Sequence, residues 1–187
     1  MKKNISNFSY GARSWRALLY FAALLSMVAV NSALAQSEDG IKAAFVYNFA
    51  KFTEWPANAF ASDSAPITVG FVGAESMADM FEKNVVGKNA NGRDFAVKRL
   101  ADATGAGMCQ LIFIGDKSQI AAILAATSGK PILMVGDSDS FASAGGMINF
   151  VKDGAKIGFD LNVSTINAAH LNLNAKLRQI ARNIKGG

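Results

Sequence analysis

The chain has 187 residues, of which 51% are hydrophobic and 18% are charged, and its formal net charge is +5. Four of the 19 Lys and Arg residues lie within positions 1–35. The rest of the chain therefore contains 15 Lys and Arg residues and 14 Asp and Glu residues. The near-neutral remainder gives no reason to expect nucleic-acid binding, which requires a basic surface.

The first 35 residues have the three parts of a secretory signal peptide. Basic residues between Lys2 and Arg16 are followed by an uncharged apolar run at 17–30, and Ala33-Leu34-Ala35 supplies the small residues of a cleavage site. A membrane anchor is the alternative, but the apolar run is shorter than the roughly 20 residues that a spanning helix needs. We therefore expect cleavage after Ala35, export to the periplasm, and a single mature domain at residues 36–187 with one hydrophobic core.

An amphipathic helix is predicted at residues 39–53. Its apolar side chains recur at a helical spacing of 3.6 residues and should face the core; they are Ile41, Ala44, Phe45, Phe49 and Phe52. Asp39 can cap the first turn. Trp55-Pro56 should end the helix, because a residue that precedes proline is disfavoured in the α conformation.

Strands and helices then alternate along the chain. Continuous apolar runs at residues 111–114 and 131–135 predict strands that are buried on both faces. Two further strands are predicted at 67–72 and 93–100. Helical spacing predicts a helix at 76–84 and another that Asp116 caps and Gly129 ends. This alternation is typical of βαβ units, so we expect an α/β domain with a mostly parallel sheet and helices on both faces.

The C-terminal part begins with a predicted β-hairpin. Two alternating segments, 147–152 and 155–161, flank Asp153-Gly154, and Asp-Gly is a favoured dipeptide of tight hairpin turns. We expect this antiparallel hairpin, at about 147–161, to form the edge of the sheet. A short helix at 163–169 and a final helix follow. The face of the final helix that should be apolar consists of Leu173, Leu177, Ile180, Ala181 and Ile184.

A catalytic centre is not apparent in the sequence. The cluster of Asp137, Ser138, Asp139 and Ser140 follows a predicted strand, where open α/β sheets bind ligands, but helix capping explains this cluster completely. His170 is the only histidine and is expected at a turn; Cys109 is the only cysteine and is expected to be a small buried hydrophobe. We therefore expect a protein that is not an enzyme and that binds no metal or cofactor.

Several segments, spread over nearly the whole mature chain, resemble the YfiR/HmsC-like family of small exported proteins. The first is IKAAFVYNFAKFTEWP at 41–56, and the others lie at 109–114, 131–137, 141–148, 156–162 and 171–178. The resemblance implies an α/β domain and a periplasmic protein that represses an inner-membrane diguanylate cyclase by binding the periplasmic sensor part of this enzyme. Such repression lowers cyclic di-GMP and, with it, biofilm and exopolysaccharide.

The same resemblance implies further partners. An OmpA-like outer-membrane lipoprotein sequesters such repressors, and members form homodimers. Some members use disulfides, but Cys109 has no second cysteine to pair with in this chain.

Partner binding requires exposed aromatic or charged anchors. The candidates are Glu54, Trp55, Phe141 and Phe150, with core packing as the alternative for each. The stretch that contains Asn172, Asn174 and Lys176 is implicated in small-ligand binding by some members. Two other functions remain open. One is a periplasmic small-solute-binding domain with a pocket near Asp137–Ser140, and the other is a hydrolase that uses Asp137 and Asp139.

Overall fold

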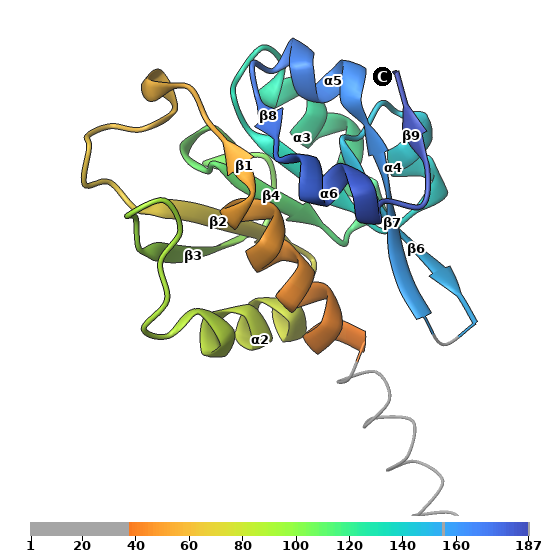
Figure 1. Ribbon diagram of the computed structural model, residues 1–187, viewed down its shortest axis with the longest axis horizontal. Helices are drawn as coiled ribbons and strands as arrows, with labels where there is room; N and C mark the ends of the chain where they lie inside the picture. Colours follow the sequence, from red (N-terminus) through yellow and green to blue (C-terminus); the bar gives the residue numbers. More distant parts are fainter. Residues whose placement is uncertain (1–37, 155, 187) are drawn as a thin grey trace, which may run out of the picture. The chain divides into compact units, whose positions relative to one another are not determined.

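A seven-stranded sheet with the order β3-β2-β4-β5-β6-β7-β9 forms the centre of the structure (Figure 1). The structure is a computed structural model that describes residues 38–154 and 156–186, so the expected signal peptide lies outside the described residues. The strands of this sheet are β2 (Ile67–Val72), β3 (Phe95–Leu100), β4 (Leu111–Ile114), β5 (Leu133–Gly136), β6 (Ile148–Asp153), β7 (Lys156–Asn162) and β9 (Ile184–Lys185). The strands from β3 to β6 are parallel, β6 and β7 form an antiparallel hairpin, and β9 lies parallel to β7.

A second sheet contains only β1 (Thr53–Glu54) and β8 (Asn172–Leu173), which are antiparallel. The α-helices are the first helix (residues 38–51), α2 (Glu75–Val85), α3 (Ile120–Thr127), α4 (Asp139–Ser143), α5 (Val163–Ala168) and α6 (Ala175–Ile180). Short 3-10 helices lie at Ala57–Ala59, Ala106–Met108 and Lys117–Gln119. Among the described residues, none of the helices is long and apolar enough to span a bilayer.

Helices cover both faces of the sheet, as the alternation of strands and helices predicted. On one face the first helix packs Phe49 against Phe150 and Phe159, with ring centroids 5.6 and 4.8 Å apart. The ring of Phe81 in α2 packs on Phe71 of β2. On the other face Thr127 of α3 donates its hydroxyl to the sulfur of Met134 at 3.1 Å. The α/β fold with a mostly parallel sheet is therefore confirmed.

The predicted apolar stripe of the first helix is only partly correct. The buried apolar residues of this helix are Ala43, Val46, Phe49 and Ala50, and of these only Phe49 belongs to the predicted stripe. By contrast, Ile41 is 41% exposed, and Ala44, Phe45 and Phe52 are half-buried. Residues 43–46 are all apolar, so the pattern fits more than one helix face. The side chains of Phe45 and Phe52 are large enough to contact the core from the border of the buried helix face.

Two predictions about the C-terminal part are also wrong. The final helix ends at Ile180, which is 61% exposed, and Ile184 belongs to β9 and is 48% exposed. The hairpin is consequently not the edge of the sheet. The backbone N–H of Arg182 donates to the oxygen of Phe159, and Leu161 donates to the oxygen of Asn183. These bonds satisfy part of the outer edge of β7, which helical residues could not do.

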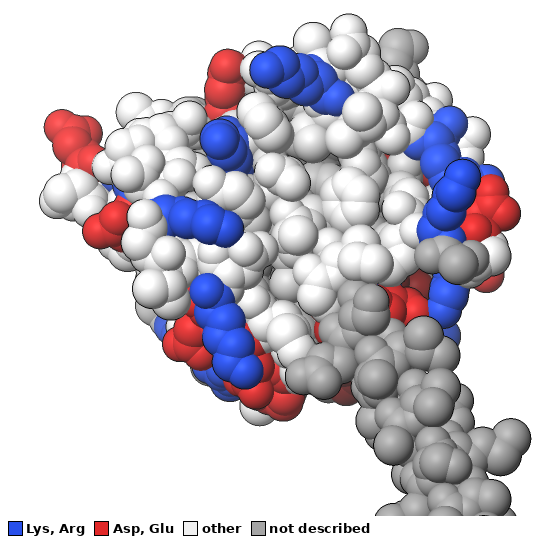
Figure 2. Space-filling view, turned by 60° about the horizontal axis from the view of Figure 1, so that its bottom comes forward, with Lys and Arg blue, Asp and Glu red and all other residues white. Residues whose placement is uncertain are grey.

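Charged residues are distributed unevenly over the described chain. Residues 152–186 contain six Lys and Arg but only two Asp, whereas residues 38–151 contain nine Lys and Arg and twelve Asp and Glu. Several basic side chains follow one another on the right-hand side of Figure 2, where β6, β7 and β9 lie in Figure 1. The domain is therefore nearly neutral overall but has a basic C-terminal part.

Candidate functional site

The pairing of β1 with β8 brings together two stretches that the sequence analysis singled out separately. Glu54 lies opposite Asn172, whose side-chain amide donates to the Glu54 carboxylate at 2.9 Å. The backbone N–H of Asn174 donates to the oxygen of Phe52, also at 2.9 Å. The first helix ends at Lys51, and Pro56 restricts Trp55 to an extended conformation; Thr53 and Glu54, between them, pair with β8.

Trp55 is held half-buried beside this ribbon. Its indole N–H donates to the backbone oxygen of Gln110 at 3.2 Å, and its ring meets that of Phe60 edge-on at 6.2 Å. The buried amide of Gln110 donates to the oxygen of Ala59 and accepts from the N–H of Thr68. Gln110 therefore fixes the loop that carries Trp55 to the start of β4. In the sequence, the one signal for Gln110 is that it is a polar residue beside a buried strand.

The beginning of α6 completes this surface. The side chain of Asn174 caps the helix by accepting the N–H of Lys176 at 3.0 Å, and Lys176 is exposed. Arg178 approaches the side-chain oxygen of Asn172 at 3.5 Å, and its Nε is buried without a hydrogen-bond partner in the described part of the chain. A pocket of about 380 Å³ lies beside the ribbon. Its lining consists of Lys51, Phe52, Glu54, Asn89, Ala90, Asn91 and Asn174.

Phe141 and Phe150, the two other candidate anchors, are not part of this surface. Their side chains are 0% and 4% exposed. The ring of Phe141 lies against the backbone of Gly136 and Gly146, and a Cβ at either glycine would overlap it. Phe150 packs against the aromatic rings of the first helix. Core packing, the alternative considered for both residues, describes their position, and neither offers a surface to a partner.

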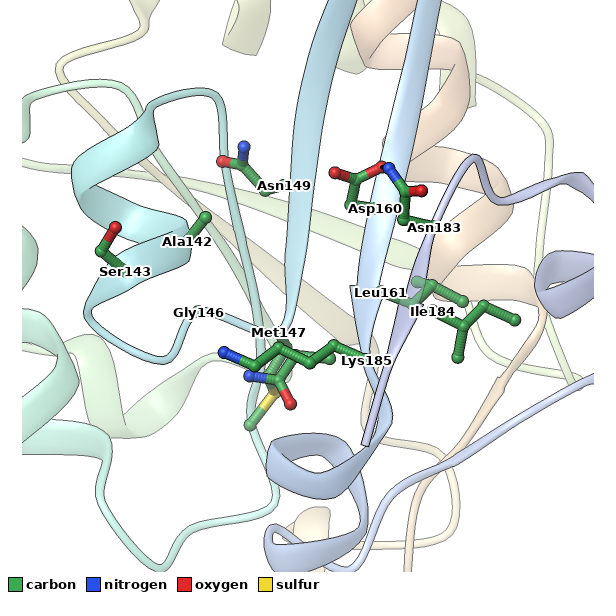
Figure 3. Close-up of a pocket in the computed structure, with 11 residues that line it drawn as sticks. Ala142, Ser143, Gly146, Met147, Asn149, Asp160, Leu161, Asn183, Ile184 and Lys185 are labelled. Carbon is green, nitrogen blue, oxygen red and sulfur yellow. Dashed lines mark hydrogen bonds between the residues drawn. The ribbon is translucent and has the colours of Figure 1, made fainter. Parts of the chain in front are cut away.

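A second pocket, of about 350 Å³, lies between α4 and the strands β6, β7 and β9 (Figure 3). Asn149 lines it and is only 6% exposed; its side-chain oxygen accepts the N–H of Ser138 at 3.1 Å. On the neighbouring strand the carboxylate of Asp160 accepts the side-chain amide of Asn183 at 3.0 Å. Lys185 also lines the pocket. A concave site with converging polar groups therefore exists close to Ser138, where the solute-binding hypothesis requires one.

The cluster at Asp137–Ser140 is only partly a helix cap. Ser138 caps α4 by accepting the N–H of Phe141 at 3.2 Å. Asp137 instead accepts the ammonium of Lys42 at 2.9 Å. Asp139 is exposed in the first turn of α4. The interpretation of all four residues as capping groups is therefore wrong for Asp137, and the sequence could not show its partner because Lys42 lies 95 positions away.

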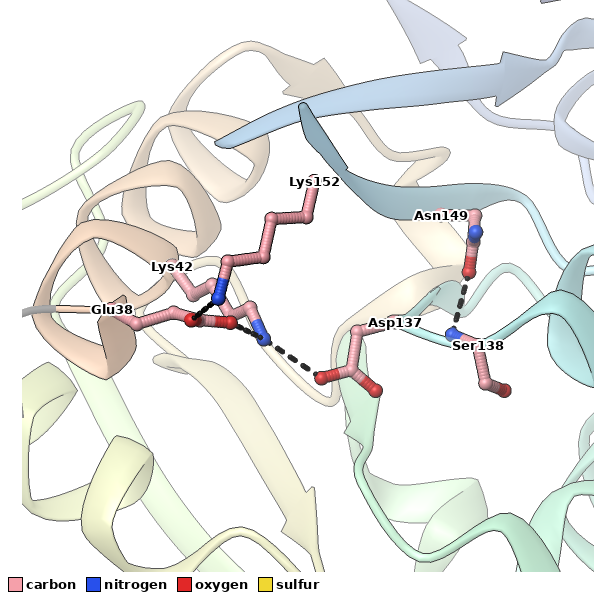
Figure 4. Close-up of polar contacts among 6 residues, drawn as sticks. All are labelled: Glu38, Lys42, Asp137, Ser138, Asn149 and Lys152. Carbon is pink, nitrogen blue, oxygen red and sulfur yellow. Dashed lines mark hydrogen bonds and ion pairs between the residues drawn. The ribbon is translucent and has the colours of Figure 1, made fainter. Parts of the chain in front are cut away.

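The contact between Asp137 and Lys42 belongs to a larger ionic cluster (Figure 4). Lys42 also pairs with Glu38 at 3.0 Å, and Glu38 pairs with Lys152 at 2.6 Å. Burial works to lower the pKa of Lys42, but hydrogen bonds to Asp137 and Glu38 outweigh it and raise this pKa. Hydrogen bonds from Lys152 and Lys42 lower the pKa of Glu38. The cluster ties the first helix to the ends of β5 and β6.

Neither Cys109 nor His170 lies in a catalytic arrangement. Cys109 is 2% exposed, and burial raises the pKa of its thiol to about 11 against the weaker opposing effect of Lys98. It is the small buried hydrophobe that was expected. His170 is exposed, with a φ of 58°, at a turn after α5. Within residues 38–154 and 156–186, no group of three or more His, Cys, Asp or Glu side chains could hold a metal ion.

Comparison with known proteins identifies one family. A family model described as YfiR/HmsC-like matches residues 39–182, which is most of the described chain. No curated protein matches the chain.

Two solved structures resemble part of the chain. A conserved domain protein from Vibrio cholerae is 10% identical over 64% of this chain, with a TM-score of 0.48. An ABC domain in complex with L-Trp from Streptococcus pneumoniae is 9% identical over 63% of this chain, with a TM-score of 0.45. The chain covers 55% and 54% of the lengths of these two proteins.

Proposed function

The chain belongs to the YfiR/HmsC-like family, and on this ground we propose that it represses an inner-membrane diguanylate cyclase by binding the periplasmic sensor part of that enzyme. Family membership indicates a periplasmic regulator of diguanylate cyclase signalling, with a regulatory and not a catalytic role. Repression by binding is the mechanism that we propose. It requires a rigid domain that presents an adhesive surface, and the consequence is less cyclic di-GMP and less biofilm.

The observation that best supports a binding role is the position of Trp55. Its ring is half-buried and fixed by the bond to Gln110, next to the exposed carboxylate of Glu54. A rigid aromatic side chain beside a charged one is typical of the few residues that supply most of the binding energy of an interface. We assign the surface formed by Glu54, Trp55 and Asn172 as the contact with the cyclase.

Two further partners are part of the proposal. An OmpA-like outer-membrane lipoprotein would relieve repression by sequestering this protein, and two copies of the chain would form a homodimer. Both follow from the resemblance to the family. Size-exclusion chromatography with light scattering of the exported protein tests the dimer, and a mass near that of one chain at micromolar concentration would contradict it.

Co-precipitation from the native host tests the proposal. An epitope-tagged copy of the full chain should recover a membrane diguanylate cyclase, identified by mass spectrometry. Trp55→Ala should abolish recovery, because it removes the ring. Trp55→Phe should retain most of it, because the phenyl ring still fills the position and only the bond to Gln110 is lost. Failure to recover any cyclase with the unaltered chain would reject the proposal.

The pocket next to α4 supports a second candidate function, the binding of a small periplasmic solute. Its converging polar groups include the nearly buried Asn149 and the carboxylate of Asp160. A ligand that binds only the folded protein raises its unfolding temperature. A thermal-shift screen should find such a ligand for the unaltered protein and lose it in Asp160→Ala. No shift with amino acids, sugars or nucleotides would remove this candidate.

A hydrolytic role has less support. Asp137 is bound to Lys42, whereas Asp139 is exposed on α4. The carboxylate of Asp137 is therefore already engaged by an ammonium group.

A further inference from the structure

The outer edge of β7 is only partly covered by another strand. β9 pairs with Leu161 and Asn162, and a single further backbone bond reaches Phe159. On its other side, β7 is paired along its whole length with β6. Within the described residues, no strand therefore lies beside the outer edge at residues 156–158. Unpaired backbone groups at a sheet edge readily accept an added strand.

The outward direction of the free backbone groups follows from the bonds that are present. Leu161 donates its N–H, and Phe159 offers its oxygen, toward the 181–185 segment. Because alternate residues of a strand direct their backbone groups to the same side, the N–H and oxygen of Ile157 point outward as well. Ile157 is thus the residue at which a further strand could pair with β7.

Three basic side chains lie near this free edge, and a fourth lies farther along the same side of β7. Lys152 is opposite Ile157 on β6, Lys156 begins β7, and Arg182 precedes β9. Lys185 is the fourth, opposite Asn162, and all four are exposed. The aliphatic part of Arg182 lies directly over Gly158, so its position is fixed by packing. Figure 2 shows basic side chains along this side of the molecule. Only Lys152 has an ion-pair partner, Glu38, among the described residues.

These charges discriminate between possible occupants of the edge. A second copy that paired edge to edge would place its own lysines and arginine against these, and like charges across an interface oppose association. An extended segment with Asp or Glu side chains would instead meet opposite charges. Ile180, at the end of α6, and Ile184, in β9, are 61% and 48% exposed, and they offer apolar contact to an added segment.

From these observations we propose that the β7–β9 edge is a docking site for an acidic, extended segment of a partner protein, which adds to the sheet as a strand beside β7. The inference rests on the proposed role as a binding protein. This edge is distinct from the surface around Trp55. The family resemblance and the comparisons do not assign this edge.

A peptide of alternating Glu and Val residues, carrying a fluorophore, tests the site directly. Fluorescence anisotropy with the purified exported protein should show binding that weakens between about 0.05 and about 0.5 M salt, because exposed charges are screened. A peptide with Lys in place of Glu should not bind. The double variant Lys156→Glu and Lys185→Glu should bind the acidic peptide about tenfold more weakly. The matched control, Lys117→Glu and Lys130→Glu, reverses two exposed lysines elsewhere and should bind normally.

Hydrogen exchange separates strand addition from charge attraction alone. The amide of Ile157 should exchange more slowly when the acidic peptide is bound, and circular dichroism should show that both double variants are folded. Equal weakening in the two double variants, or unchanged exchange at Ile157, would overturn the proposal. Binding to phosphatidylglycerol vesicles without binding to the peptide would also overturn it, by assigning the charges to a membrane surface.

The same variants distinguish this inference from the proposed function. In the native host, a chain with Lys156→Glu and Lys185→Glu should restore repression of cyclic di-GMP poorly in a strain that lacks the gene. If the unaltered chain restores repression and the double variant does so equally well, the edge proposal fails and the repressor proposal stands. If deletion does not change cyclic di-GMP, the repressor proposal fails, and the peptide experiment alone decides the edge.

Discussion

Substitution of Phe141 by Ala should destabilise the fold severely. The Phe141 side chain is 0% exposed and packs on the backbone of Gly136, in β5, and of Gly146, just before β6. Replacing a buried Phe by Ala typically lowers the free energy of unfolding by about 3–5 kcal/mol, and the loss is greater when the surroundings cannot collapse into the cavity. Here the neighbours are backbone atoms held in or beside the sheet, so we expect about 4 kcal/mol.

Urea unfolding of the purified protein, followed by circular dichroism, measures this loss. A typical domain has only about 5–15 kcal/mol of stability, so Phe141→Ala should lower the urea midpoint strongly or prevent folding. Phe141→Leu should lose less than half as much because it refills most of the cavity, and it remains measurable if the Ala variant does not fold. A loss below about 1 kcal/mol for Phe141→Ala would refute the packing argument. It would also reopen Phe141 as a surface anchor.

Three other outcomes follow from the contacts. Gly146→Ala should lower the free energy of unfolding by about 1–3 kcal/mol, because the added Cβ would overlap the Phe141 ring. The control is Gly40→Ala, whose added Cβ contacts nothing, and it should be neutral or slightly stabilising in the same urea titration. Glu38→Gln should lower the free energy of unfolding at neutral pH. Because the pKa of Glu38 is lowered in the folded protein, the difference in stability between this variant and the unaltered protein should vanish as the pH falls below this pKa. A difference in stability that stays constant with pH would contradict the ionic cluster. Burial raises the pKa of the Cys109 thiol from 9.0 to about 11. Cys109 should therefore react with a thiol reagent about a hundredfold more slowly in the folded than in the unfolded protein. Equal reaction rates in the two states would contradict its burial.

Local pattern was sufficient for the strands of the central sheet other than β9. Strands buried on both faces are continuous apolar runs, and β4 was predicted with the bounds that the structure has, Leu111–Ile114. The two-residue strands β1, β8 and β9 have no such pattern. They form because distant backbone groups meet, and this information is absent from a local window of sequence.

The candidate surface illustrates the same limit. The resemblance to the family drew attention to Glu54 and to Asn172, but the hydrogen bond between them depends on β1–β8 pairing across 118 positions. Phe150 alternates with Asn149 along β6, and nothing in the hairpin pattern shows which of the two faces the first helix. The ion pair between Lys42 and Asp137 likewise joins parts of the chain that no local pattern connects.

The most direct test of the repressor proposal is the concentration of cyclic di-GMP in the native host. It should be measured in the parent strain, in a strain that lacks this gene, and in that strain after the gene is restored. The proposal predicts a rise on deletion and a return to the parental concentration on restoration. An unchanged concentration after deletion, under conditions in which the parent strain expresses the protein, would contradict repression of a diguanylate cyclase.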